Sequence, residues 1–228
     1  MHKLESISEH IRQVFEVRTA ARDQALSRAR SLIRHCALAI RAVHRGAIDV
    51  MREHLVEARR LADELGEGLV DHPDLYYAGY TQDALKEFAE ASITCALILG
   101  QDLPTLEELH VIHSTYLNGL AESVGELRRR ILDILRQGYS DEVEKLLGHM
   151  DDIYAVLVTM DYPDAITNGL RRQTDVIRGI LERTRADVTL SLRSQHLAGA
   201  IARLSVQLPG AEDLPGMPAG PDLPLEEG

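Results

Sequence analysis

Two acidic stretches set among apolar residues decide the fold of this chain: "EFAEASITCALILG" (residues 87–100) and "YLNGLAESVGELRRR" (residues 116–130). In both stretches the apolar residues recur every three or four positions, which is the spacing of one buried face of an α-helix. Each stretch also carries a pair of glutamates at a helical spacing. Acidic side chains in such surroundings stay in water, share protons or hold a cation. Which of these applies decides whether the chain is an enzyme.

The composition indicates a globular protein with an aliphatic core. Of the 228 residues, 45% are apolar, 27% are charged and 4% are aromatic, and tryptophan is absent. A core made of Leu, Ile, Val and Ala favours helices packed on helices. The formal net charge of −11 argues against a surface coated with basic residues for duplex binding, although it leaves room for a local basic stripe.

The cysteines and the apolar runs point to a soluble protein of the cytoplasm. Cys36 and Cys95 both lie in apolar helical runs, and no CxxC pattern suggests a zinc site, so we expect two reduced, buried thiols. The first residues, "MHKLESISEHIRQ", lack the apolar core of a signal peptide. No run reaches the ~18 uninterrupted apolar residues of a membrane span. We therefore expect a cytoplasmic location and no membrane partner.

Helical periodicity continues along almost the whole chain, and no alternating strand pattern interrupts it. Proline, glycine and helix-capping residues divide the pattern into segments. We expect helices over residues 4–45, 47–66, 77–99 and 113–137, a fifth helix capped by Ser140, and a last helix from Pro163 to about residue 206. The prediction is an all-α bundle of six or seven helices with unusually long first and last members.

The two ends of the chain carry different patterns. Apolar residues at intervals of three and four predict that the first helix is buried along one face from its first turns: Leu4, Ile7, Ile11, Val14 and Phe15. At the other end, five of the eight prolines fall in the last twenty residues, within "LPGAEDLPGMPAGPDLPLEEG". We therefore expect one helical domain over residues 1–206 and a disordered, acidic tail over residues 207–228.

The four glutamates form two pairs on consecutive helices. Glu87 and Glu90 are three residues apart and Glu122 and Glu126 are four apart, so each pair lies on one face of its helix. A short link joins the two helices, so we expect antiparallel neighbours whose carboxylates converge. Clustered carboxylates are costly unless a cation neutralises them, and Mg²⁺ and Mn²⁺ prefer oxygen ligands. The spacing also fits a solvated acidic face, because glutamate is a good helix former.

Arginines gather in two places that could meet a phosphate backbone. Arg34, Arg41 and Arg45 recur at intervals of seven and four on the first helix, and Arg129 and Arg130 follow the second acidic pair. As a group they are candidates for nucleic-acid binding, whereas each one alone also fits a solvated surface charge. Few aromatic residues are present for base stacking, so we expect recognition of the backbone with weak sequence specificity.

At this point the stretch "LKEFAEASITCALI", followed later by "YLNGLAESVGELRRRILD", resembles the translin superfamily, in particular translin-associated factor X (TRAX) and its prokaryotic relatives. The stretch "MDDIYAVLVTMDYPDAITNGLRRQTDVIRGILERTRADVT" is similar to the closing helices of that family. The first helix, with "RDQALSRARSLIRHCALAIRAVHRG", is compatible with the family, and the resemblance covers residues ~5–190. The most specific run, YL-x-G-x-A-[DE]-x-x-GEL-x-R, is matched by Tyr116, Leu117, Gly119, Ala121, Gly125, Glu126, Leu127 and Arg129.

The resemblance implies a fold, an assembly and an activity. It implies an all-α bundle whose copies assemble into a hollow barrel around nucleic acid, as a homo-octamer or a homo-hexamer. It also implies an endoribonuclease that depends on Mg²⁺, or on Mn²⁺, and that cleaves single-stranded RNA. The acidic site of the TRAX type falls on Glu87, Glu90, Glu122 and Glu126, which we expect to bind the metal and to be catalytic.

One departure from the family pattern leaves a second interpretation open. The family has aspartate where this chain has Glu122, so the carboxylate lies one methylene farther from its helix, and a near-octahedral Mg²⁺ site is sensitive to such a shift. All four positions remain acidic, which favours the enzyme. The alternative is a non-catalytic translin-like protein that encloses single-stranded RNA or single-stranded DNA. A third interpretation is a helical assembly with a solvated acidic groove.

Overall fold

The computed structural model describes residues 2–207, and every regular element in that range is a helix. Three single turns lie in the connections: α3 (Pro73–Tyr76), α5 (Leu106–Leu109) and α8 (Asp164–Thr167). The six long helices are α1 (His2–His44), α2 (Ile48–Glu67), α4 (Gly79–Ile98), α6 (His113–Leu135), α7 (Asp141–Val158) and α9 (Leu170–Gln207). The predicted all-α class, with long first and last helices, is confirmed.

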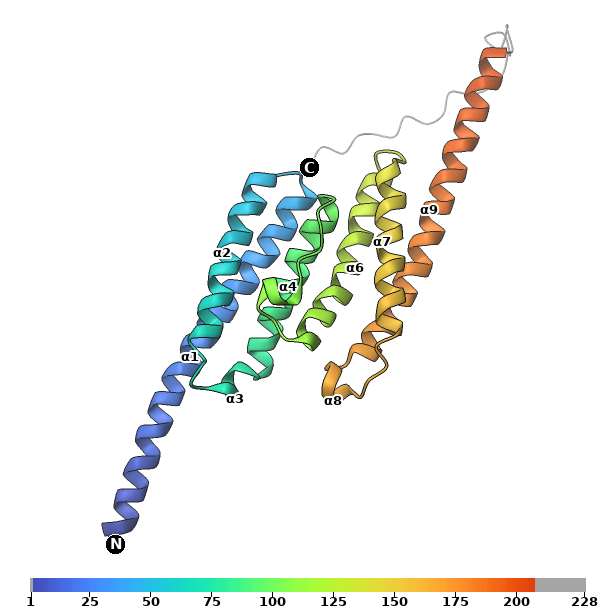
Figure 1. Ribbon diagram of the computed structural model, residues 1–228. Coiled ribbons are helices and arrows are strands. Elements are labelled where there is room, and N and C mark those ends of the chain that lie inside the picture. The colour runs from blue at the N-terminus through green and yellow to red at the C-terminus, as the bar shows by residue number, and fades with distance from the viewer. Residues whose placement is uncertain (1, 208–228) are drawn as a thin grey trace, which may run out of the picture.

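The long helices lie side by side, with α4 and α6 in the middle of the row (Figure 1). Helix α1 packs against α2 and α4, whereas α6 packs against α4, α7 and α9. The core follows these contacts and is almost entirely aliphatic, as the composition predicts. Cys36 and Cys95 are free, buried thiols within it. Its fully buried large side chains include Leu32, Met51, Leu65, Phe88, Leu127, Ile131 and Met150.

Gly119 allows α6 to approach α4 more closely than any other residue would. A Cβ atom added at this position would lie 2.8 Å from Ala89 Cβ, 2.9 Å from the Lys86 carbonyl oxygen and 3.0 Å from the Glu90 backbone nitrogen. Distances this short are not tolerated, and two of the three neighbours are backbone atoms that cannot rotate away. The glycine of the YL-x-G run therefore has a structural role, which is to hold the two acidic helices at close range.

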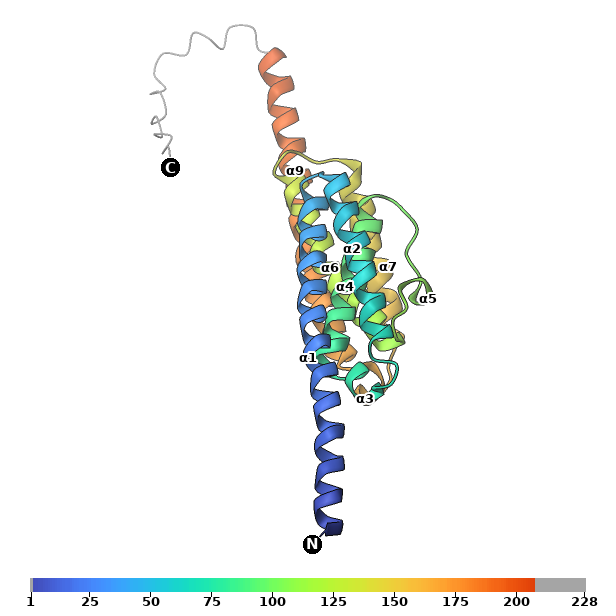
Figure 2. The ribbon, with the colours of Figure 1, turned by 90° about the vertical axis from the view of Figure 1, so that its left-hand side faces the viewer.

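The first half of α1 is not buried, contrary to the sequence prediction. The side chains of Leu4, Ile7, Ile11, Val14 and Phe15 are exposed, Leu4 at 66% and Phe15 at 63%. Figures 1 and 2 show the reason: the N-terminal half of α1 and the C-terminal half of α9 extend beyond the bundle at opposite ends. The other helices cover α1 only from Ala25 onward. The periodicity is present, but no surface within the described residues covers it.

The helix predicted from Pro163 is interrupted at Asn168 and Gly169, two residues at which the sequence suggests a local loosening. Asn168 and Gly169 both have positive φ angles, 54° and 83°, and separate the single turn α8 from α9. This left-handed conformation is typical of Asn and Gly after a helix C-terminus. Ser140 does precede α7 as predicted, but its side chain makes no capping hydrogen bond. The predicted tail lies outside the described residues from position 208 onward.

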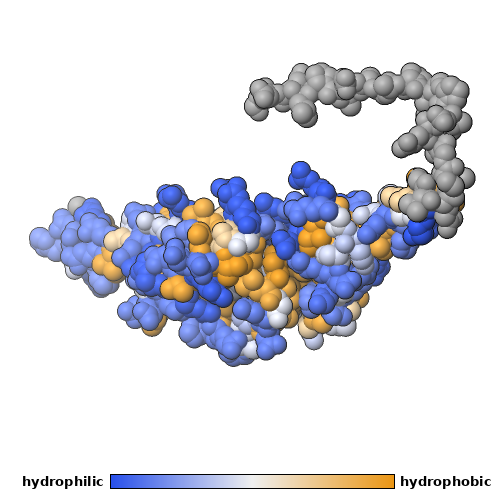
Figure 3. All heavy atoms as spheres, turned by 90° about the horizontal axis from the view of Figure 1, so that it is seen from above, coloured by the Kyte–Doolittle hydropathy of each residue, from blue (hydrophilic) through white to orange (hydrophobic). Residues whose placement is uncertain are grey.

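The surface is mixed in polarity. Viewed from one end of the bundle, apolar residues gather near the middle of the face and hydrophilic residues flank them on both sides (Figure 3). Among the described residues, no helix combines the length and the apolar character needed to cross a membrane.

The α4–α6 contact predicts opposite effects for two glycine substitutions in the same helix. Gly119→Ala should lower the free energy of unfolding by roughly 1–3 kcal/mol, because the added methyl group forces α4 and α6 apart. Gly125→Ala, with open space around its Cβ position, should raise the free energy of unfolding by about 0.5–1 kcal/mol through helix propensity. Urea denaturation followed by circular dichroism measures both changes. Equal stabilisation by the two substitutions would contradict the close approach at Gly119.

Candidate metal centre

Three carboxylates from two helices converge beside Gly119. Glu87 and Glu90 come from α4 and Glu122 comes from α6, and each offers an oxygen atom within 4.8 Å of the oxygens of the other two. All three side chains are partly buried. We call these residues the glutamate triad. The predicted convergence of the two acidic helices is thus present, with three of the four carboxylates in one group.

Glu122 is held by two residues that the sequence analysis did not select. Lys86 Nζ donates to both carboxylate oxygens of Glu122, at 2.7 Å and 2.5 Å, and lies 3.4 Å from Glu87 Oε1. Gln173 of α9 donates to Glu122 Oε1 at 3.3 Å. The lysine supplies a positive charge inside the acidic group. It also competes with any metal ion for the oxygens of Glu122.

Glu126, the fourth predicted site residue, stands apart from the triad. Its Oε2 atom lies 2.6 Å from Nε2 of His44, at the C-terminus of α1, and 3.4 Å from Nη1 of Arg129. An ionised carboxylate only accepts hydrogen bonds, so His44 Nε2 is the donor. The imidazole is almost fully enclosed, with 2% of its side chain exposed. Glu126 is therefore anchored by α1 and by its own helix rather than by α4.

The site changes the pKa values of two of its carboxyl groups in opposite directions. Burial, reinforced by the negative charges of Glu87, Glu122 and Glu126, raises the pKa of Glu90 to about 8. The hydrogen bond from His44, helped by the charge of Arg129, lowers the pKa of Glu126. The cation-free site thus holds a proton on Glu90 near neutral pH.

Lys86 responds to the same crowding. Burial acts to lower the pKa of Lys86, but the carboxylates of Glu122 and Glu87 outweigh it, so the pKa is raised. The lysine stays charged and offsets part of the negative charge. The pKa of Glu90 remains high despite the neighbouring ammonium group, because burial and the charges of Glu87, Glu122 and Glu126 outweigh the lysine.

The donor set of the triad fits a hard divalent cation. Three carboxylates within reach of one another are the ligands that Mg²⁺ and Mn²⁺ prefer, with water completing the coordination. Burial and the negative charges of the neighbouring carboxylates together raise the pKa of Glu90, so an ionised Glu90 needs its charge compensated. A bound divalent cation would supply that compensation and would displace the proton from Glu90.

The predicted arginines occupy three different environments. Arg129 is half exposed beside Glu126, and Arg130 pairs with Glu142 of α7 at 2.8 Å. Arg34, Arg41 and Arg45 are exposed on α1 and in the turn after it. Arg41 and Arg45 flank His44 in sequence, so they belong to the end of α1 that reaches the site. Arg34 lies earlier in α1, ten residues before His44.

A polar cavity of about 690 Å³ adjoins the acidic site. His44 forms part of its wall, together with Arg130 and Arg136 and the turn from Gln137 to Ser140 that connects α6 to α7. Asp133 and Glu142 also line it, so its charges are mixed. The cavity brings two arginines next to the residue that anchors Glu126.

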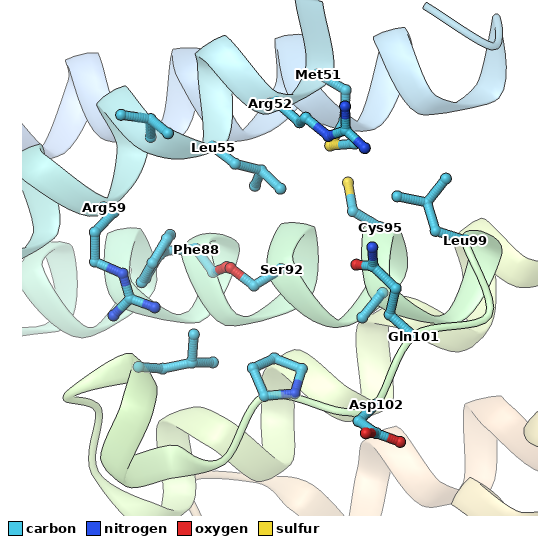
Figure 4. A pocket seen from close by; sticks show the side chains of 14 residues that line it. Met51, Arg52, Leu55, Arg59, Phe88, Ser92, Cys95, Leu99, Gln101 and Asp102 are labelled. Carbon is cyan, nitrogen blue, oxygen red and sulfur yellow. The ribbon is translucent and has the colours of Figure 1, made fainter. Parts of the chain in front are cut away.

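A second cavity, of about 540 Å³, lies on the other side of α4 and is mainly apolar. Figure 4 shows Phe88, Ser92 and Cys95 of α4 facing Met51 and Leu55 of α2. Burial raises the pKa of the Cys95 thiol to about 12, so this cysteine is not a nucleophile at neutral pH. The cavity therefore offers volume without a reactive group.

Sequence reasoning missed Lys86, Gln173 and His44. A signal existed for His44, because it continues the buried stripe of α1 four residues after Ile40 and eight after Cys36. Lys86 and Gln173 gave no such signal, since their importance arises only from contact with a carboxylate on another helix. The spacing of the glutamates is a local property, whereas their partners are determined by packing.

The raised pKa of Glu90 predicts a pH-dependent stability in the absence of metal. Between pH 4.5 and about 8 the folded chain holds a proton that the unfolded chain has released, so stability falls as pH rises across this window. Glu90→Gln removes the effect and should raise the free energy of unfolding by roughly 1–3 kcal/mol at pH 8.5, with little change at pH 4.5. Urea denaturation in EDTA across this range measures it. Glu53→Gln, at an exposed position of α2, is the control, and matching pH profiles for the two variants would contradict the assignment.

Comparison with known proteins gives relatives over most of the chain. No family model matches it. An uncharacterized protein of Methanocaldococcus jannaschii is 31% identical over 191 residues, which cover 83% of this chain and 84% of that protein. The structure of AfC3PO in complex with duplex RNA is similar with a TM-score of 0.76 and 32% identity, over 82% of this chain and 96% of that one.

Two further structures agree with this result. The crystal structure of AfC3PO gives a TM-score of 0.76 and 31% identity, over 82% of this chain and 97% of that one. The structure of apo-NeC3PO gives a TM-score of 0.74 at 20% identity, over 80% of this chain and 96% of that one, and so supports the fold alone. These C3PO proteins are of the translin and TRAX type. On the shared fold and the extent of the sequence match, this chain belongs to the translin superfamily, together with TRAX-like relatives.

Proposed function

We propose that this protein is an endoribonuclease that depends on Mg²⁺ or Mn²⁺ and that the glutamate triad holds the metal. The observation that carries the proposal is the convergence of Glu87, Glu90 and Glu122, from two helices, within 4.8 Å. A solvated acidic face would let these charges separate, whereas here the three side chains are partly buried, and burial together with the neighbouring carboxylates raises the pKa of Glu90. Single-stranded RNA is the proposed substrate, and single-stranded DNA is a second candidate ligand.

The residues of the site divide the work of phosphodiester hydrolysis. When bound, the divalent cation supplies charge stabilisation at the phosphate and makes water more acidic. Lys86 orients Glu122 and keeps a positive charge at the edge of the triad. Glu126 is held at Oε2 by the hydrogen bond from His44 and can accept a proton from water at its other oxygen. Glu90 must lose its proton before the triad can bind the cation with three charges.

The arginines around the site support an RNA path. Arg129 lies against Glu126, and Arg130 and Arg136 line the adjoining polar cavity. Arg41 and Arg45 are exposed near the same end of α1. Guanidinium groups bind phosphate oxygens well, so a strand passing along these residues would bring its backbone to the triad. The AfC3PO structure with duplex RNA makes RNA the first nucleic acid to test.

A non-catalytic, RNA-binding translin-like protein is the alternative function, and one observation favours it. Lys86 already occupies the oxygens of Glu122, and the longer side chain of glutamate compared with aspartate brings those oxygens to the lysine. A site neutralised in this way could bind RNA through its arginines and leave the metal out. The two functions differ in whether RNA is cut.

The enzyme proposal predicts cleavage that requires both metal and the triad. We expect single-stranded RNA to be cut with Mg²⁺ or Mn²⁺ and to remain intact in EDTA. Glu90→Gln, Glu122→Gln and Glu126→Gln should each reduce the rate at least about 100-fold. These variants should still retain RNA in a gel-shift assay, because the arginines remain in place. Labelled single-stranded and duplex RNA, incubated in parallel and separated on denaturing gels, provide the measurement.

Glu53→Gln removes an exposed acid far from the triad in sequence and should cleave at the wild-type rate. RNA that is shifted but never cut would replace the enzyme with the binding function. Neither binding nor cleavage at physiological salt would leave a helical assembly without a nucleic-acid role.

We infer that the protein forms a homo-oligomer, of eight or six copies, through the parts of α1 and α9 that leave the bundle. The N-terminal half of α1 exposes a row of apolar side chains, and the distal part of α9 exposes Leu190, Leu197 and Leu204. Such rows on projecting helices are typical of contact surfaces between proteins. A hollow assembly of these copies would enclose the RNA.

The oligomer is tested by its mass. Light scattering should give a multiple of the 25.4 kDa chain mass. The double substitution Ile11→Glu and Phe15→Glu should shift that mass downward, because it places charges on the exposed apolar row of α1. Gln24→Glu, at an exposed polar position of the same helix, should leave it unchanged. A wild-type mass of 25.4 kDa would contradict the proposal.

A further inference from the structure

His44 combines three properties that an ordinary core histidine does not share. Its imidazole is 2% exposed, its Nε2 atom lies 2.6 Å from Glu126 Oε2, and its Nδ1 atom has no hydrogen-bond partner among the residues that the structure describes. Buried polar atoms in folded proteins nearly always have partners. The unpaired Nδ1 atom lowers stability, and the hydrogen bond of the other ring nitrogen goes to Glu126 of the candidate site.

Glu126 is anchored at one oxygen and free at the other. Both donors that reach it, His44 Nε2 and Arg129 Nη1, contact Oε2. Among residues 2–207, no donor contacts Oε1. The carboxylate is close enough to Glu90 for its charge to raise the pKa of that residue, yet it is not one of the three carboxylates that converge. Glu126 thus lies at the border of the glutamate triad with one oxygen available.

We propose that His44 is a positioning residue that holds Glu126 outside the glutamate triad, so that Glu126 acts as a proton acceptor in the reaction and not as a metal ligand. This inference rests on the proposed endoribonuclease function. It assigns different roles to carboxylates that the sequence pattern treats as equivalent. It also connects α1 to the proposed chemistry between α4 and α6.

The proton balance of the step is simple. One O–H bond of the attacking water breaks and its proton passes to Glu126 Oε1, while the water oxygen forms a bond to phosphorus. The phosphorus–oxygen bond to the leaving group breaks, and the leaving oxygen takes a proton from solvent. Glu126 then returns its proton to solvent. The hydrogen bond to His44 supports this role because it fixes the carboxylate through Oε2 and leaves Oε1 free to take the proton.

A test must separate a ligand from a proton acceptor, so metal binding is measured apart from cleavage. Mn²⁺ affinity is determined by electron paramagnetic resonance for the wild-type protein, Glu90→Gln and Glu126→Gln. We expect Glu90→Gln to bind Mn²⁺ roughly 10- to 100-fold more weakly, because it loses a carboxylate of the triad. Glu126→Gln should bind within about twofold of wild type and yet fail to cleave RNA.

The role of His44 is tested by two substitutions and a double-mutant cycle. His44→Leu should lower kcat by about 10- to 100-fold with little change in KM, and His44→Gln, which can still donate to Glu126, should recover part of the loss. The double variant His44→Leu with Glu126→Gln should be no slower than Glu126→Gln alone. The melting temperature of each single variant should stay within about 4 °C of wild type. If His44→Leu does not fold, His44→Gln and its cycle with Glu126→Gln decide the question.

The outcomes separate this inference from the function on which it rests. If the wild-type protein neither binds Mn²⁺ nor cleaves RNA, the proposed function fails and the inference falls with it. If the wild type binds Mn²⁺ and cleaves, a loss of Mn²⁺ by Glu126→Gln equal to that of Glu90→Gln shows that Glu126 is a ligand and overturns the inference. Wild-type kcat in His44→Leu, or independent effects in the cycle, overturns the role of His44.

Discussion

The contact between α4 and α6 at Gly119 is the constraint on which the rest of the site depends. Glycine brings the backbones together where an alanine methyl would lie 2.8 Å from Ala89 Cβ. One turn after this contact, Glu122 leaves α6 on the side that faces α4 and meets Glu87 and Glu90. Hydrophobic packing along both helices supplies the free energy that holds like charges together. The acidic site is therefore a product of close helix packing and not of a flexible loop.

The crowding of negative charge gives the carboxylates of the site different protonation states and different partners. Glu90 keeps its proton because its pKa is raised, whereas Glu126 accepts hydrogen bonds from His44 and Arg129. The ammonium group of Lys86 forms an ion pair with Glu122. The three carboxylates thus have different partners, on α1, α4 and α6, and the electrostatic environment differs from one carboxylate to the next. An uneven set of carboxylates can divide the tasks of binding a cation and accepting a proton, which an even set cannot do.

Local sequence patterns predict the helices and the glutamate pairs, because both depend on spacing along one helix. The all-α class and the convergence of α4 with α6 follow from apolar periodicity and from a short connection. The apolar pattern of one helix does not predict burial or ion pairs that depend on the neighbouring helix. The stripe at Leu4 and Phe15 predicts burial, but no part of the described chain covers it. The partnership of Lys86 with Glu122 likewise requires the register of two helices, which no single-helix pattern contains.

A count of charges connects the glutamates to the kind of ion that would suit them. The four carboxylates of the region face two permanent cations, Lys86 and Arg129, and the imidazole of His44 donates a hydrogen bond to Glu126. When Glu90 is ionised, the carboxylates outnumber the permanent cations by two, which is the charge that one divalent cation would balance. A second divalent ion would need Lys86 to leave Glu122 and Glu87, and it would place excess positive charge beside the ammonium group. At the proposed metal site we therefore expect one divalent ion and not two, with Lys86 supplying the remaining positive charge.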